Sequence, residues 1–121
     1  MIRHLTGDPP ELAARATAAL AAADELLLTD LVVAGCVYVL ESFYEVDRER
    51  VAELMRAAIA LPSINTVDGA TLLRALEVYE IQRLDFAEAY LVAQAEATGV
   101  GRVMSFDRSI DRVGTVKRQE S

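Results

Sequence analysis

Long uninterrupted hydrophobic segments are lacking from this chain of 121 residues. The longest apolar stretch, residues 31–40, falls well short of the about 18–20 residues that a membrane-spanning helix needs. The chain also lacks a basic N-terminal segment followed by an apolar core, so no secretory signal is predicted. From these two absences we expect a protein of the cytoplasm that does not bind membranes.

Cysteine and histidine are nearly absent, since the chain has one of each. A single cysteine cannot form an internal disulfide, and we expect Cys36 to be a buried, unreactive thiol rather than a nucleophile. His4 has no evident partner and is expected at the surface. Glycine-rich phosphate loops, zinc-ligand spacings and nucleophile motifs are missing as well. Repeats and linkers are also lacking, so the length predicts a single domain over residues 1–121.

Basic residues are few, with 12 against 19 acidic residues and a net charge of −7. Proteins that bind nucleic acid through charge alone are normally basic. Two interpretations stay open: the chain does not bind nucleic acid, or it binds through metal ions that bring the positive charge. The negative charge also suits a basic protein partner. Hydrophobic residues make up 53% of the chain, which favours a folded core.

Helical and strand patterns alternate along the chain. We expect helices at residues 8–23, 30–45, 47–60, 68–82 and 85–98, and short apolar strands at residues 26–29, 64–67, 102–106 and 114–116. Apolar strands without alternation are typical of a parallel sheet covered by helices on both faces. The helix at 30–45 is apolar on nearly every side, so we expect other elements or a second subunit to cover it. Gly35, in its middle, costs about 1 kcal/mol relative to alanine.

Acidic residues follow the third predicted strand and open the last predicted helix. Asp107 comes directly after the strand at 102–106, and ligands of parallel sheets bind beyond the carboxyl ends of strands. Asp107 therefore either holds a metal or caps the turn that follows. Asp85 and Glu88 have the spacing of a capping arrangement at a helix start, with metal ligation as the alternative. Asp111 is close enough to share the site, or is a solvated loop acid.

Two short motifs carry a resemblance to a known family. Residues 84–89 read Leu-Asp-Phe-Ala-Glu-Ala, and residues 105–108 read Ser-Phe-Asp-Arg. With the stretches at 2–9 and 32–40, they resemble the PIN-domain ribonucleases, in particular the VapC toxins of bacterial toxin–antitoxin pairs, over nearly the whole chain. The resemblance implies a three-layer α/β fold with a short parallel sheet between helices. It also implies Mg²⁺ or Mn²⁺ held by a quartet of acids.

Carried over by position, the third and fourth acids of that quartet fall on Glu88 and Asp107. These two are the predicted catalytic residues and metal ligands, and Asp85 is either a further ligand or a helix cap. Arg108 and Arg112, beside Asp107, are candidates for contact with the RNA backbone, or are solvated loop arginines.

Two positions depart from the family pattern. Gly35 stands where the second acid, a helical glutamate, is expected, and the central first strand with the first acid has no counterpart after Met1. Our hypothesis is that the natural start lies upstream of Met1. In-frame codons for a short apolar strand ending in aspartate would support it, and their absence would defeat it.

The resemblance favours a Mg²⁺-dependent endoribonuclease toxin of a VapBC-type pair, with full or impaired activity. The alternative is a catalytically weak PIN-like domain that binds an antitoxin or RNA without cutting. A receiver-type signalling domain is disfavoured because no lysine directly follows the third strand; the only lysine is Lys117. The partners implied are a VapB-like antitoxin, a tRNA or other structured RNA, and a second copy of the chain in a homodimer.

Overall fold

The computed structural model describes residues 25–105 and 107–119. In chain order the elements are β1 (Leu26–Leu27), α3 (Asp30–Ser42), α4 (Arg48–Ile59), β2 (Ile64–Asn65), α5 (Gly69–Glu77), the π-helix η1 (Val78–Gln82), α6 (Phe86–Thr98), β3 (Arg102–Met104), the 3₁₀ helix η2 (Arg108–Arg112) and β4 (Lys117–Gln119). The first predicted helix and His4 lie outside the described residues. The other four predicted helices are confirmed, and η1 continues α5 without a break.

Local capping signals set the helix boundaries. Asp47 and Asp68 each accept a hydrogen bond from the backbone N–H three residues on, at 2.9 and 3.1 Å. α3 begins at Asp30, as predicted, and Thr29 caps it. It ends at Ser42, three residues before the predicted end. Gly99, at φ +77°, ends α6 in the left-handed conformation that glycine adopts without strain.

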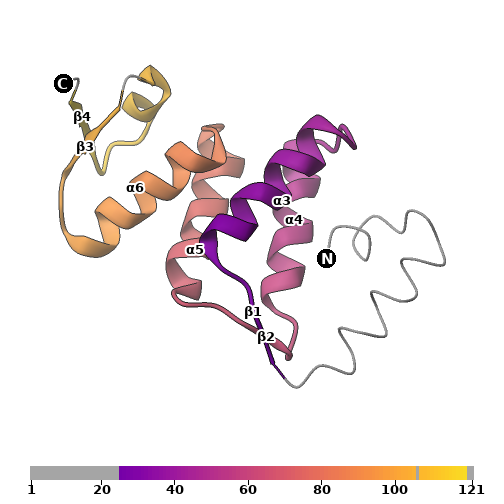
Figure 1. Cartoon of the computed structure of the whole chain (residues 1–121). Coiled ribbons are helices and arrows are strands. Elements are labelled where there is room, and N and C mark those ends of the chain that lie inside the picture. The colour runs from indigo at the N-terminus through magenta and orange to yellow at the C-terminus, as the bar shows by residue number, and fades with distance from the viewer. Residues whose placement is uncertain (1–24, 106, 120–121) are drawn as a thin grey trace.

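The core is formed where the four α-helices meet around α5. α5 packs against α6 on one side and α4 on the other, and α3 contacts both α4 and α6 (Figure 1). Most of the largest fully buried side chains come from the four helices and from η1, among them Leu40, Met55, Leu72, Tyr79 and Val92. Cys36 is buried as predicted, and burial raises the pKa of its thiol.

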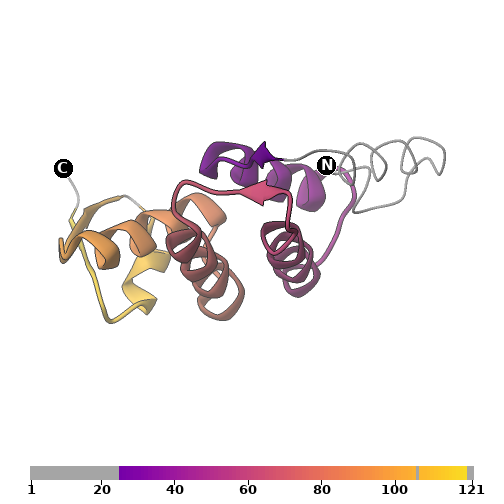
Figure 2. The same ribbon diagram turned by 90° about the horizontal axis from the view of Figure 1, so that it is seen from below.

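The strands are parallel, as predicted, but they form two separate pairs. β1 pairs with β2, with Leu26 opposite Ile64, and β3 pairs with β4, with Arg102 opposite Lys117. Figures 1 and 2 show the two pairs at different ends of the helical layer, with α6 running from α5 toward the β3–β4 pair. Within residues 25–105 and 107–119 they do not join into one sheet. The three-layer arrangement therefore stays a prediction.

All four strand predictions are wrong in detail, and β2 and β3 each end before the predicted residue. The last strand lies at Lys117–Gln119 rather than at 114–116, and Val116 is instead a buried residue just before it. The first strand is shorter than predicted, and its two residues are exposed, Leu26 by 40% and Leu27 by 65%. Only Leu28, directly after it, is buried.

α3 leaves part of its apolar surface open. It buries Val33, Val37 and Leu40, whereas Leu31 is 80% and Tyr38 64% exposed. The covering expected from other elements is thus incomplete in the described part of the chain. None of the described helices is long and apolar enough to cross a bilayer.

Candidate functional site

Ser105, at the end of β3, connects the two predicted site acids. Its buried hydroxyl donates to Glu88 Oε2 at 2.9 Å and accepts the backbone N–H of Asp107 at 3.0 Å. Glu88 lies in the first turn of α6, and Asp107 immediately precedes η2. The structure therefore brings the predicted residues Glu88 and Asp107 to either side of one hydroxyl, at the carboxyl end of a parallel strand.

Asp107 caps η2 and carries a stabilised negative charge. Its Oδ1 accepts the backbone N–H of Ser109 at 2.9 Å. Hydrogen bonding from Ser109 lowers the pKa of the Asp107 carboxyl below its ordinary value, and the positive charges of Arg112 and Arg118 act in the same direction. The capping interpretation of Asp107 is confirmed. Capping does not exclude metal ligation, because a carboxylate accepts several contacts through its two oxygens.

The capping arrangement predicted for Asp85 and Glu88 is wrong. Asp85 occupies the N-cap position of α6, but its exposed carboxylate makes no capping hydrogen bond. Glu88 reaches Ser105 instead. Within the described residues, no hydrogen bond joins Asp85 to Ser105, Glu88 or Asp107, so its part in the site stays a prediction.

Arg118 on β4 also contacts this site, and the sequence analysis did not predict its role. Its guanidinium pairs with Asp111 through Nε–Oδ1 at 3.2 Å and Nη2–Oδ2 at 3.3 Å, and it donates to the Ser105 carbonyl at 3.4 Å. Asp111 thus holds η2 against β4. A separation of seven residues across two different elements carries no periodic pattern that could have revealed this pair.

The two arginines predicted to contact RNA differ in their surroundings. Arg112 donates through Nη1 to the carbonyls of Gln82 and Arg83, both at 3.3 Å. Arg108, the first residue of η2, is exposed. Both arginines are exposed, but Arg112 has a role in the fold, whereas Arg108 makes no hydrogen bond or ion pair with the described residues.

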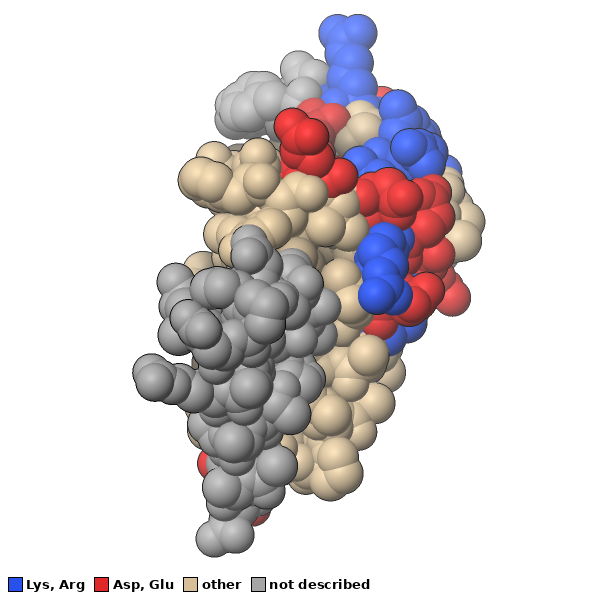
Figure 3. All heavy atoms as spheres, turned by 90° about the vertical axis from the view of Figure 1, so that its right-hand side faces the viewer, with Lys and Arg blue, Asp and Glu red and all other residues tan. Residues whose placement is uncertain are grey.

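The charged surface around α4 is mixed in sign. Figure 3 shows acidic and basic side chains interleaved on this face. Arg56 pairs with Glu80 at 2.8 Å, Arg83 with Glu49 at 3.3 Å, and Arg50 with Glu53. Because these cations are paired with acids, the face does not provide the continuous positive surface that binding of a phosphate backbone by charge alone requires.

Glu88 and Asp107 are the two predicted metal ligands that lie beside Ser105. Within the described residues there is no group of three or more His, Cys, Asp or Glu side chains that could enclose a metal. Mg²⁺, however, is commonly held by one or two carboxylates, with waters and substrate phosphates completing its six oxygens. Gly35 is exposed on α3 and supplies no ligand. The described site is thus a two-acid site.

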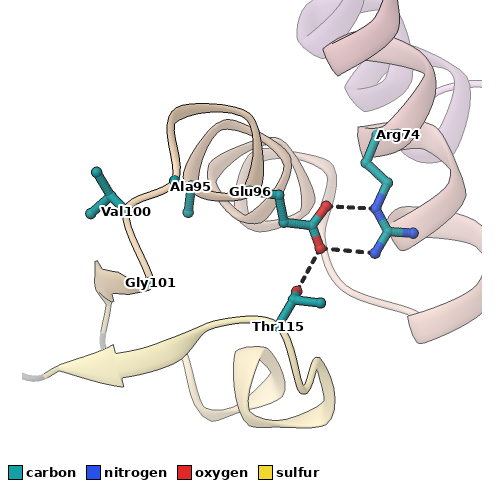
Figure 4. Close-up of a pocket in the computed structure, with 7 residues that line it drawn as sticks. Arg74, Ala95, Glu96, Val100, Gly101 and Thr115 are labelled. Atoms are coloured by element: carbon teal, nitrogen blue, oxygen red, sulfur yellow. Dashed lines mark hydrogen bonds and ion pairs between the residues drawn. The ribbon is translucent and has the colours of Figure 1, made fainter.

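A second polar cluster lines a cavity of about 510 Å³ between α5, α6 and the segment before β4. Glu96 accepts Arg74 Nε at 2.7 Å and Arg74 Nη2 at 2.9 Å, and Thr115 Oγ1 donates to Glu96 Oε2 at 2.5 Å (Figure 4). Hydrogen bonding from Arg74 lowers the pKa of Glu96. Since these groups satisfy one another, the cluster joins three segments of the fold and offers no open ligand position.

Comparison with known proteins agrees with the resemblance seen in the motifs. The PIN domain family matches residues 1–116, a range that includes Glu88, Ser105 and Asp107. No curated protein and no solved structure matches the chain. PIN domains are generally nucleases and generally use divalent metal ions. With nearly its whole length matched, the chain belongs to the PIN domain family.

Proposed function

We propose that this chain is a metal-dependent endoribonuclease of the VapC type, the toxin of a toxin–antitoxin pair, acting on tRNA or another structured RNA in the cytoplasm. The observation that carries the proposal is the connection from Glu88 through Ser105 to Asp107 at the end of β3. It joins the first turn of one helix to the cap of another, so that two acids of the motifs lie in one place.

Each residue of this connection has a separate task. Glu88 and Asp107 hold Mg²⁺ or Mn²⁺, and Asp85, exposed at the start of α6, is the candidate for a third ligand. A cation bound there supplies positive charge to the phosphate and lowers the pKa of a bound water. Ser105 orients Glu88, and the lowered pKa of Asp107 keeps its carboxylate ionised at neutral pH. Arg108 contacts a phosphate of the RNA.

We infer the protein partners from the exposed apolar side chains of α3 and of Phe43, its C-cap residue. Leu31, Tyr38 and Phe43 are large apolar side chains that are at least 64% exposed. Exposed apolar side chains gathered on one element are typical of protein interfaces. We assign this surface to a second copy of the chain or to a VapB-like antitoxin, the two partners that the VapC resemblance implies.

The second candidate function is binding of an antitoxin or of RNA without cleavage. The small number of acids favours it: Gly35 takes the place of a glutamate, and the described site keeps two carboxylates of the four that the PIN resemblance implies. A nuclease needs a defined metal site and turnover, whereas a binding module needs neither. Metal dependence and turnover therefore separate the two.

The test is cleavage of a pool of tRNA and structured RNA with Mg²⁺, with EDTA, and by two variants in Mg²⁺. Asp107→Asn removes a proposed ligand, and Glu53→Gln removes an exposed carboxylate on α4 that contacts neither acid of the pair. The proposed nuclease cuts with Mg²⁺, stops with EDTA, loses cutting with Asp107→Asn and keeps most of it with Glu53→Gln. Folded protein that binds RNA or antitoxin without cutting would establish the second candidate instead.

A further inference from the structure

We propose that Arg112 is a positioning residue, which fixes Glu88 and Asp107 relative to one another by fastening the end of η2 to the turn that precedes α6. The benefit for metal binding rests on the function proposed above. The fastening itself does not depend on that function.

The contacts form a closed ring. Ser105 links Glu88 of α6 to the backbone of Asp107, and Asp107 caps η2 through Ser109. Arg112, the last residue of η2, donates to the carbonyls of Gln82 and Arg83 at the end of η1. Those carbonyls lie three and two residues before Asp85, which occupies the N-cap position of α6. The two acids are thus connected twice, once through Ser105 and once through Arg112.

The turn that receives Arg112 has an unusual backbone. Arg83 has φ +61°, in the left-handed region that non-glycine residues rarely adopt, directly after the π-helix η1. Such a turn persists when its surroundings hold it. Arg48 of α4 also holds this segment, because it donates to the carbonyls of Tyr79 and Leu84 at 2.8 and 2.6 Å. Arg112 adds the hydrogen bonds that tie this turn to η2.

Arg112 contributes little to the stability of the whole fold, because its side chain is exposed and its two contacts share one Nη1 atom. Removing Arg112 is instead expected to change the local geometry and metal affinity of Glu88 and Asp107. Residues that orient metal ligands without binding the metal typically change metal affinity by about 10–100-fold when they are removed. A positioning residue therefore changes metal affinity without changing the stability of the whole fold, whereas a merely stabilising residue changes that stability.

The experiment compares Arg112→Ala, Arg112→Lys and Arg50→Ala in the full chain. Arg50→Ala is the control, because it removes one arginine charge from an exposed ion pair on α4 and leaves the contacts of Arg112 in place. Three quantities are measured: the Mn²⁺ dissociation constant by calorimetry, the exchange rates of the Asp107 and Ser109 amides without metal by NMR, and the urea midpoint.

We expect Arg112→Ala to weaken Mn²⁺ binding by about tenfold. We also expect it to speed exchange of the two amides by about fivefold, which corresponds to a local loss of about 1 kcal/mol. Its urea midpoint should stay close to that of Arg50→Ala. Arg112→Lys should recover most of both effects, because a single donor makes both contacts.

Amide exchange that Arg112→Ala leaves unchanged would overturn the proposal, whatever the metal affinity. Faster exchange with unchanged Mn²⁺ affinity would overturn it as well, since the contact would then be purely structural. If the unsubstituted chain binds no Mn²⁺, the metal site of the proposed function fails. The exchange rates then decide alone whether Arg112 fixes the pair.

Discussion

Among arginine-to-alanine substitutions on α4, Arg48→Ala should cause the largest loss in the free energy of unfolding. Arg48 Nη1 donates to the carbonyls of Tyr79 and Leu84, and its Cζ lies 4.4 Å from the centroid of the Tyr79 ring. Tyr79 and Leu84 are both fully buried. The guanidinium therefore serves two backbone acceptors in the interior, beside the turn that leads into α6.

The magnitude follows from what the variant leaves behind. A buried acceptor without a partner costs about 1–3 kcal/mol, and the cation–π contact contributes about 0.5–1 kcal/mol. Both carbonyls share one donor atom, so the two hydrogen-bond contributions do not add in full. We expect Arg48→Ala to lower the free energy of unfolding by about 2–4 kcal/mol, and Arg48→Lys by about half as much.

Urea unfolding followed by circular dichroism measures this loss. Arg50→Ala is the matched control on the same helix, because Arg50 makes an exposed ion pair with Glu53, and such pairs contribute about 0–1 kcal/mol. An Arg48→Ala loss no larger than that of Arg50→Ala would refute the reasoning. The carbonyls of Tyr79 and Leu84 would then be satisfied without the guanidinium.

Two further predictions concern α3 and the cluster around Glu96. Gly35→Ala should stabilise the fold by about 1 kcal/mol in the same urea assay, because a Cβ at Gly35 meets nothing within 4 Å and helix interiors disfavour glycine; a loss of stability would show that another segment packs closely there. Glu96→Gln should cost about 1 kcal/mol at pH 7 through the weakened contact with Arg74. Because the folded pKa of Glu96 lies below its ordinary value of 4.5, this cost is fully present above pH 4.5 and shrinks as pH falls through the folded pKa. A difference between the two proteins that does not change from pH 7 to pH 3.5 would contradict the assignment.

The helices were predictable because their signals are local. Asp47 and Asp68 accept backbone hydrogen bonds within their own first turns, and Gly99 ends α6 through its own φ. The strands were less predictable, because a strand of two or three residues is defined by its partner. Nothing in residues 114–119 indicates that pairing with β3 begins at Lys117 and not earlier.

The acids of the site were predictable, but the contacts that organise them were not. Glu88 and Asp107 were identified from two motifs, and the structure brings both to Ser105. The capping alternative was wrong: Asp85 makes no capping hydrogen bond, and the Glu88 carboxylate accepts from Ser105, a residue 17 positions away that only the fold brings close. The contacts of Arg112 and Arg118 likewise join separate elements, and no periodicity in the sequence encodes them.

The most direct test of the Glu88–Asp107 site is cleavage of structured RNA by Asp107→Cys in Mg²⁺ and in Cd²⁺. A thiolate is a poor ligand for Mg²⁺ and a good one for a soft cation. The native thiol should not interfere, because Cys36 is buried and its pKa is raised. If Asp107 ligates the catalytic cation, the variant loses cleavage in Mg²⁺ and regains part of it in Cd²⁺, while the unsubstituted chain cleaves in Mg²⁺. Cleavage in Mg²⁺ that Asp107→Cys leaves unchanged, or no cleavage by the unsubstituted chain, would contradict the site.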